Sequence, residues 1–349
     1  MNTRDLLLRR RMMMEGRSPL PPPPDYRTVP LTFEILSDGN ILWAHSDTAQ
    51  TIEYSKNGGE WTSITATADG AEIPVVTGDN LRFRGTAWPG PVSCQFASTC
   101  QFSVKGNPSS LKYGDVLTGN EALEEECFVS LFAECEGLTS AADLALPATT
   151  LAGSCYDSMF YGCTSLTAVP ELPGATLAFR CYAFMFSGCA SLTTTPELPA
   201  TTLEEECYLE MFSGCESLTA APELPATTLA PACYEYMFKG CASLTTTPEL
   251  PATTLEEECY DAMFSGCTSL EVAPELPATT LALSCYAEMF SDCTNLSEVK
   301  CYAEDISAQS CVDDWLDGVS ATGTFTKKAG VNWPSGASGI PSGWSVVEV

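Results

Sequence analysis

The 18 cysteines of this sequence are its most reactive side chains, and most of them are regularly spaced. Zinc sites favour cysteines roughly two to four residues apart, whereas the paired cysteines here are eight residues apart. Residues eight apart in a helix are separated by about 12 Å, which is beyond the reach of a disulfide. We therefore expect reduced, buried thiols in two columns with a period of 26 residues: Cys155, Cys181, Cys207, Cys233, Cys259 and Cys285, then Cys163, Cys189, Cys215, Cys241, Cys267 and Cys293. Outside the columns, Cys94 and Cys100 lie near an expected hairpin and could pair in an oxidising medium.

Catalytic chemistry has few candidates among the remaining residues. His45 is the one histidine, so the repeats cannot contain a cysteine–histidine pair. Neither a glycine-rich phosphate loop nor a paired-histidine metal motif is present. Carboxylates are abundant, but a glycosidase pair needs a shaped cleft that a uniform array does not obviously provide. We expect no enzymatic activity, no catalytic residues and no cofactor.

Two polar columns are the candidate binding residues. Glu171, Glu197, Glu223, Glu249 and Glu275 occupy one equivalent position in five successive repeats. We expect a solvated acidic face there, and the alternative is a weak ladder for cations such as calcium, or a surface for a basic partner. Thr176, Thr202, Thr228 and Thr254 form a second column that we expect to be an exposed polar ladder able to contact sugar hydroxyls.

The repeat that carries these columns predicts a solenoid over residues 113–300. In one unit, Cys233, Met237 and Cys241 fall at i, i+4 and i+8 with Tyr234 and Phe238 beside them, which predicts one short amphipathic helix ending near Gly240. The prolines that follow favour short extended segments rather than helix. The expected fold class is therefore β-rich α+β, with one short helix and short strands in each 26-residue repeat. Residues 190–208 and 242–260 are identical, which indicates duplication of a two-repeat block.

Three further regions flank the solenoid. Residues 31–112 contain short β-branched and aromatic runs separated by turn signals, with Asn57-Gly58 the strongest, and predict a small β-sandwich. Residues 301–349 are expected to form a C-terminal cap. Residues 1–30 are expected to be a basic arm on a proline-rich spacer, with a candidate anchor at Leu6, Leu7, Arg9, Arg10, Arg11 and Met13.

The repeated Met-Phe-x-Gly-Cys-x-Ser-Leu motif resembles the BspA-like leucine-rich repeats of gut Bacteroidetes and their bacteriophages. The resemblance covers about residues 113–300, and the closing stretch Gly339-Ile340-Pro341-Ser342-Gly343-Trp344 looks like the cap of that group. The segment Glu53-Tyr54-Ser55-x-x-Gly58-Gly59-x-Trp61 is similar to the module that precedes such repeats. The resemblance implies adhesion and surface recognition, without a specific ligand.

The net charge and the missing export signal limit the classes of partner and the cellular locations that we expect. A net charge of −29 argues against nucleic acid as a partner. The sequence contains no run of about 18 apolar residues, so we expect no membrane span. No secretory signal is recognisable, so the chain is expected to stay in the cytosol of the cell that makes it. The leading hypothesis is a bacteriophage virion protein, whose arm binds other virion proteins and whose solenoid binds a host-surface protein or glycan; homo-oligomers are compatible with it. The alternatives are a bacterial cell-surface adhesin and a cytosolic scaffold.

Overall fold

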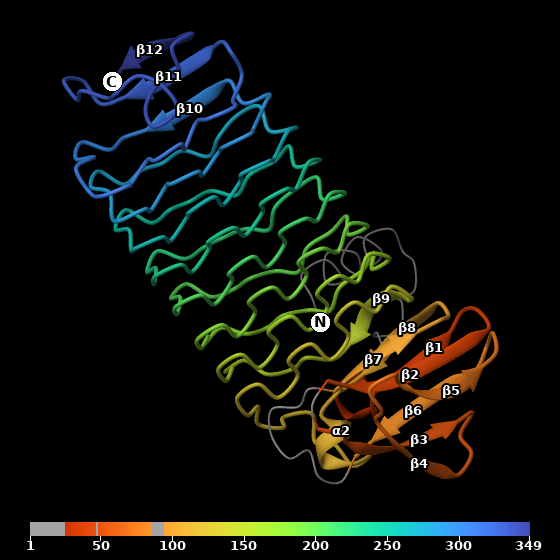
Figure 1. The fold of residues 1–349 in the computed structure, drawn as a ribbon. Helices are drawn as coiled ribbons and strands as arrows, with labels where there is room; N and C mark the ends of the chain where they lie inside the picture. The colour runs from red at the N-terminus through yellow and green to blue at the C-terminus, as the bar shows by residue number, and fades with distance from the viewer. Residues whose placement is uncertain (1–24, 47, 86–93) are drawn as a thin grey trace, which may run out of the picture.

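The computed structural model describes residues 25–46, 48–85 and 94–349, and its fold is β-rich with very little helix (Figure 1). Within these residues, helix is limited to η1 (Tyr26–Thr28) and α2 (Ser110–Tyr113). The strands before the repeats are β1 (Thr32–Ile35), β2 (Gly39–His45), β3 (Thr51–Lys56), β4 (Trp61–Thr65), β5 (Ala71–Val75), β6 (Asn80–Arg84), β7 (Cys94–Ser98) and β8 (Phe102–Gly106). No described helix has the length and apolar character needed to cross a bilayer.

The strands β1–β8 form two sheets around an aromatic core. One sheet has the order β4-β3-β6-β1-β8-β9 and the other has the order β5-β2-β7, with antiparallel pairing throughout β1–β8. Phe33 of the first sheet and Phe96 of the second meet at 4.9 Å between ring centroids, and both are fully buried. The turn signals in this region therefore predicted a two-sheet arrangement that the structure contains.

The strand β9 (Leu138–Leu144) joins the two-sheet domain to the stack of coils. It belongs to the first coil, yet it pairs in parallel with β8. The aromatic core continues across the junction, because Phe132 lies 5.9 Å from Phe33 and 5.8 Å from Phe96 between ring centroids. The two-sheet domain thus covers the first coil, which would otherwise expose its apolar face at the end of the solenoid.

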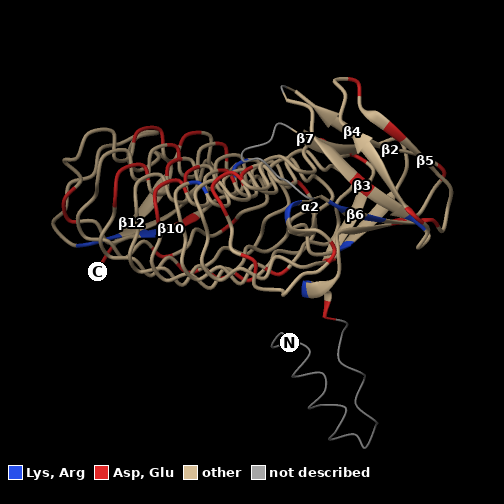
Figure 2. Cartoon of the chain, turned by 90° about the horizontal axis from the view of Figure 1, so that it is seen from below, with Lys and Arg blue, Asp and Glu red and all other residues tan. Residues whose placement is uncertain are grey.

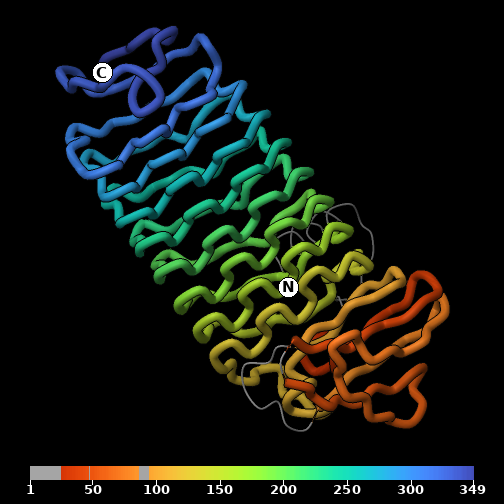
Figure 3. The backbone as a smooth tube through the Cα atoms, in the orientation of Figure 1, coloured from red at the N-terminus to blue at the C-terminus, as the bar shows by residue number. Residues whose placement is uncertain are grey.

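The predicted helix in each repeat is wrong, and a series of turns replaces it (Figure 3). Every fourth residue has a positive φ, as at Ala232 (50°), Tyr236 (54°) and Gly240 (72°), which an α-helix does not allow. Alternate amides close turns within the coil: Met237 N–H donates to the Tyr234 carbonyl at 3.2 Å. The amides between them reach the next coil: Phe238 N–H donates to the Met263 carbonyl at 2.9 Å. We call this segment, residues 230–241 and its equivalents, the turn spiral.

The turn spiral points its apolar residues inward in continuous columns. Met159, Met185, Met211, Met237, Met263 and Met289 are fully buried, so their predicted inward orientation is confirmed. Successive phenylalanines from Phe132 to Phe290 stack at 5.5–5.7 Å between ring centroids, and a parallel tyrosine column runs beside them. Burial of each such side chain contributes roughly 1.5–3 kcal/mol. The columns therefore give every coil an apolar interface with its two neighbours.

The other half of each coil is extended, although few of its residues are in regular strands. In one coil Pro248, Leu250 and Ala252 are buried while Glu249, Pro251 and Thr253 are exposed, which is the alternation of a strand. Proline lacks an N–H group, so a continuous ladder of hydrogen bonds between coils cannot form here. Isolated parallel bridges remain, such as Thr202 with Thr228 and Ala220 with Thr246.

A C-terminal cap ends the stack. The strands β10 (Glu298–Cys301), β11 (Gly323–Lys327) and β12 (Trp344–Glu348) pair in parallel, one for each of the last three coils. Trp315 continues the tyrosine column, at 6.3 Å from Tyr286 between ring centroids, and Trp333 stacks on Trp315 at 5.2 Å. The two tryptophans thus cover the apolar end of the solenoid.

Candidate binding surface

The two polar columns predicted from the sequence lie on the extended half of the coils and are exposed. Glu171, Glu197, Glu223, Glu249 and Glu275 all face solvent, as do Thr176, Thr202, Thr228 and Thr254. Two parallel bridges connect neighbouring threonines directly, Thr150 with Thr176 and Thr202 with Thr228. The structure therefore places both columns on one side of the coils, within a few residues of each other.

A further set of threonines belongs to the same surface and was missed in the sequence. Thr201, Thr227, Thr253 and Thr279 immediately precede the predicted column and are exposed as well. Their signal was the strict alternation of Glu-Leu-Pro-Ala-Thr, which places Glu249, Pro251 and Thr253 on the outward side. We define the ladder face as the outward glutamate, proline and two threonines of each coil from residue 197 to residue 280.

The backbone of the extended half holds these side chains at fixed spacing. The Leu203 N–H group donates to the Thr228 carbonyl at 3.0 Å, and the Leu151 N–H group donates to the Thr176 carbonyl at 2.9 Å. The buried leucines beside the threonines fix the side-chain direction, because they pack into the core of the coil. The ladder face is consequently an ordered row of hydroxyl groups, proline rings and carboxylates.

Acidic side chains crowd on the turn spiral rather than on the ladder face (Figure 2 shows the acidic residues spread along the coils). Burial, followed by repulsion from Asp261 and neighbouring glutamates, raises the pKa of Glu235 to about 7. Burial, followed by repulsion from Glu288 and Glu258, raises the pKa of Asp261 to about 7. Earlier in the array, Arg180 relieves the same crowding by pairing with Asp157 at 3.0 Å and with Glu206 at 2.7 Å.

The cysteine columns are buried, as predicted. The thiols of the second column also contribute hydrogen bonds between coils: Cys241 Sγ donates to the Phe212 carbonyl at 3.1 Å, and the same contact recurs at Cys163, Cys189, Cys215, Cys267 and Cys293. Burial raises the pKa of Cys233 and of Cys241 to about 12. A thiol that stays protonated is a poor nucleophile and a poor metal ligand.

The pairing of Cys94 with Cys100 is contradicted by the strand between them. Cys94 lies opposite His45 at one end of the β2–β7 ladder, whereas the Cys100 thiol donates to the Asn40 carbonyl at the other end. Six residues of extended chain span roughly 20 Å, far beyond disulfide reach. His45 itself is a strand residue, and burial raises the pKa of the neighbouring Cys94 thiol, so the pair does not offer a thiolate.

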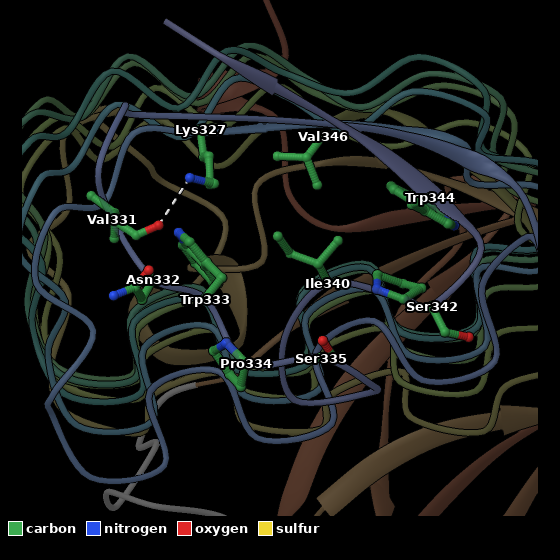
Figure 4. A pocket seen from close by; sticks show the side chains of 11 residues that line it. Lys327, Val331, Asn332, Trp333, Pro334, Ser335, Ile340, Ser342, Trp344 and Val346 are labelled. Atoms are coloured by element: carbon green, nitrogen blue, oxygen red, sulfur yellow. Dashed lines mark hydrogen bonds between the residues drawn. The ribbon is translucent and has the colours of Figure 1, made fainter.

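A pocket in the C-terminal cap was not predicted. Its volume is about 340 Å³, and Figure 4 shows Trp333, Ile340 and Val346 around a common space with Lys327 at one side. The Lys327 ammonium donates to the Val331 carbonyl at 2.9 Å, which ties the loop to β11. We call this the tryptophan pocket; it is lined by Lys327, Val331, Asn332, Trp333, Pro334, Ser335, Ile340, Pro341, Ser342, Trp344 and Val346.

The remaining site predictions are not resolved by the geometry. The candidate anchor at Leu6, Leu7, Arg9, Arg10, Arg11 and Met13 lies outside the described residues. Across residues 25–46, 48–85 and 94–349, no group of three or more histidine, cysteine, aspartate or glutamate side chains is arranged to hold a metal ion. Weak calcium binding by the glutamate column, the alternative to a solvated acidic face, stays a hypothesis.

Comparison of the chain with protein-family models, with curated proteins and with solved structures finds no match. The resemblance to BspA-like repeats therefore rests on the sequence motifs alone and stays a prediction.

Proposed function

We propose that this protein is a non-enzymatic structural and adhesion protein, whose ladder face binds a protein or glycan on a cell surface. The observation that carries the proposal is the recurrence of one exposed set of side chains on successive coils that backbone hydrogen bonds lock together. An ordered row of equal, weak contacts gives avidity, because the first contact raises the effective concentration of the next.

The chemistry of the ladder face suits a hydroxylated ligand. Each threonine hydroxyl can donate and accept a hydrogen bond, and each glutamate carboxylate accepts. The proline ring between them, as at Pro251, adds an apolar patch between the polar groups. A glycan presents hydroxyl groups beside apolar C–H faces, so it can pair with both components. The acidic charge of the coils disfavours an anionic polymer as the ligand.

The setting that we propose is a bacteriophage particle. This part of the proposal depends on the motif resemblance and on the basic arm at residues 1–17. The arm would bind other virion proteins, and the solenoid would meet the host cell.

The test is adsorption of fluorescently labelled protein to Bacteroidetes cells, measured by flow cytometry. We expect the variant with Thr227→Ala, Thr228→Ala, Thr253→Ala and Thr254→Ala to adsorb at least about tenfold less, since each lost hydrogen bond costs about 1 kcal/mol. The matched control is Thr164→Ala with Thr294→Ala, two exposed threonines outside the ladder face. Equal adsorption of the parent and the four-threonine variant, at equal melting temperature, would exclude the ladder face as the binding surface.

A further inference from the structure

The tryptophan pocket combines apolar walls with hydrogen-bond donors. Trp333, Ile340 and Val346 give it apolar surface, and Asn332 and Ser342 lie on opposite sides of it (Figure 4). Asn332 and Ser342 line the pocket and are exposed, so the amide N–H groups of Asn332 and the hydroxyl of Ser342 can donate to an acceptor on a ligand.

A proline-rich segment is the ligand that matches this composition. Proline has no N–H group, so a run of prolines brings carbonyl acceptors and ring surface but no backbone donors. A polyproline II conformation has no internal hydrogen bonds, which leaves those carbonyls free, and aromatic-lined grooves are a recurrent binding site for such segments. This chain contains one such run, Pro21–Pro24, preceded by Pro19.

The run cannot reach the pocket of its own molecule. It is joined to Asp25, and Asn107 holds the adjacent Arg27 carbonyl by a hydrogen bond of 2.9 Å at the two-sheet domain. Six residues extend at most roughly 20 Å. The phenylalanine column from Phe132 to Phe290 has six steps of 5.5–5.7 Å, so it alone is roughly 30 Å long. The strands β11 and β12, which carry part of the pocket lining, lie beyond the coils at the end opposite to the two-sheet domain (Figures 1 and 3).

We propose that the tryptophan pocket binds the segment Pro19–Pro24 of a second copy, so that copies associate head to tail. Charge supports the pairing: residues 1–17 carry five arginines against Asp5 and Glu15, whereas residues 301–349 carry six acidic and two basic side chains. The two ends that meet are different surfaces, so the contact is heterologous and produces open chains or closed rings. The glutamate and threonine columns of successive copies would then extend over a longer assembly.

Two neighbouring valines of β12 provide a matched pair of variants. Val346 lines the pocket and Val347 does not, and their side chains are exposed to similar extents, 47% and 44%. Successive residues of a strand point to opposite faces, so Val346→Asp charges the pocket and Val347→Asp charges the other face. Because both positions are exposed, neither change buries a charge in the core.

The test is sedimentation velocity of the full chain over a range of protein concentrations. The parent should associate increasingly with concentration, and a synthetic peptide of residues 16–26 should reverse the association. Val346→Asp should weaken association at least tenfold, Val347→Asp should associate like the parent, and the variant with Pro21→Ala, Pro22→Ala, Pro23→Ala and Pro24→Ala should stay monomeric.

Mixing the two defective variants provides the decisive experiment. The Val346→Asp variant keeps its proline run and the four-proline variant keeps its pocket, so a mixture of the two should form one-to-one dimers but no longer chains. A parent that stays monomeric at all concentrations would overturn the proposal, as would a mixture that stays monomeric. Equal loss in the two valine variants would also overturn it, because that result would place the contact on the free edge of β12.

Discussion

At the residue scale, the cysteines illustrate how a reactive side chain becomes structural. Each thiol of the second column is buried and donates to a phenylalanine carbonyl of the preceding coil, as Cys241 does to Phe212. Zinc binding needs a thiolate, and burial opposes its formation by raising the pKa. The period of the cysteines was readable in the sequence, but the hydrogen bond that they donate depends on the stacking of coils.

Thiol labelling tests this account. With a pKa of about 12, the Cys233 and Cys241 thiols are almost fully protonated at pH 8. We expect labelling by a thiol reagent to be slower by on the order of a thousandfold in the native protein than in denaturant, from the thiolate fraction alone. Rapid labelling of both columns under native conditions would contradict the assigned burial.

The crowded carboxylates of the turn spiral predict the pH dependence of stability. The pKa values of Glu235 and Asp261 are raised in the folded state to about 7, so the folded protein binds more protons than the unfolded chain at mildly acidic pH. The stability that protonation of these two groups contributes is present at mildly acidic pH and is lost as the pH rises through about 7. We expect the melting temperature to fall between about pH 5.5 and pH 8.

Neutral isosteres provide the control for this dependence. Glu235→Gln and Asp261→Asn should flatten the pH profile, whereas Glu249→Gln on the exposed ladder face should leave its slope unchanged. A melting temperature that rises with pH over this range would show that repulsion on the turn spiral does not limit stability.

At the element scale, the sequence predicted that the apolar side chains face inward, but it did not predict the backbone conformation that places them there. Cys233, Tyr234, Met237, Phe238 and Cys241 fit an apolar helical stripe, and they fit a spiral that repeats every four residues equally well. The two structures differ in where alternate backbone N–H groups donate. In the turn spiral their acceptors lie in the next coil, so the local sequence carries no signal for them. The tryptophan pocket was unpredictable for a related reason, since the loop of residues 331–342 forms it by packing on β11 and β12.

Gly240→Ala tests the left-handed backbone that the turn spiral requires at this position. In the turn spiral Gly240 has a φ of +72°, and a Cβ atom there would meet only ordinary contacts at 3.8 Å, so the backbone conformation sets the cost. We expect the free energy of unfolding to fall by about 1 kcal/mol in urea titrations.

The equivalent position in a later coil provides the converse change. Asp292 has a φ of 59° at the position where Gly162, Gly188, Gly214, Gly240 and Gly266 are glycine. Asp292→Gly should therefore raise the free energy of unfolding by about 0.5 kcal/mol. Stabilisation by Gly240→Ala together with destabilisation by Asp292→Gly would contradict the positive φ at this position.

At the scale of the whole molecule, the solenoid is a row of interchangeable coils between two unlike ends. The two-sheet domain covers the first coil (Figure 1), and Trp315 and Trp333 stack on the end of the tyrosine column at the last coils. Because each coil contacts only its neighbours, stability is a sum of coil and interface contributions, and the number of coils can change without a change of fold. The identical segments 190–208 and 242–260 indicate that such a change has occurred in this chain.

The most direct test of the account is therefore removal of one two-coil block, residues 190–241, whose ends join in an unchanged register because the flanking sequences are identical. Adsorption of this deletion variant to Bacteroidetes cells should be measured beside its melting temperature and its radius of gyration in solution. The account predicts a folded, shorter rod that melts cooperatively and adsorbs more weakly than the parent, since fewer copies of the ladder-face set remain. Unfolding of the variant would contradict interchangeable coils, and a folded variant whose adsorption is either unchanged or abolished would contradict a binding surface built from repeated contacts.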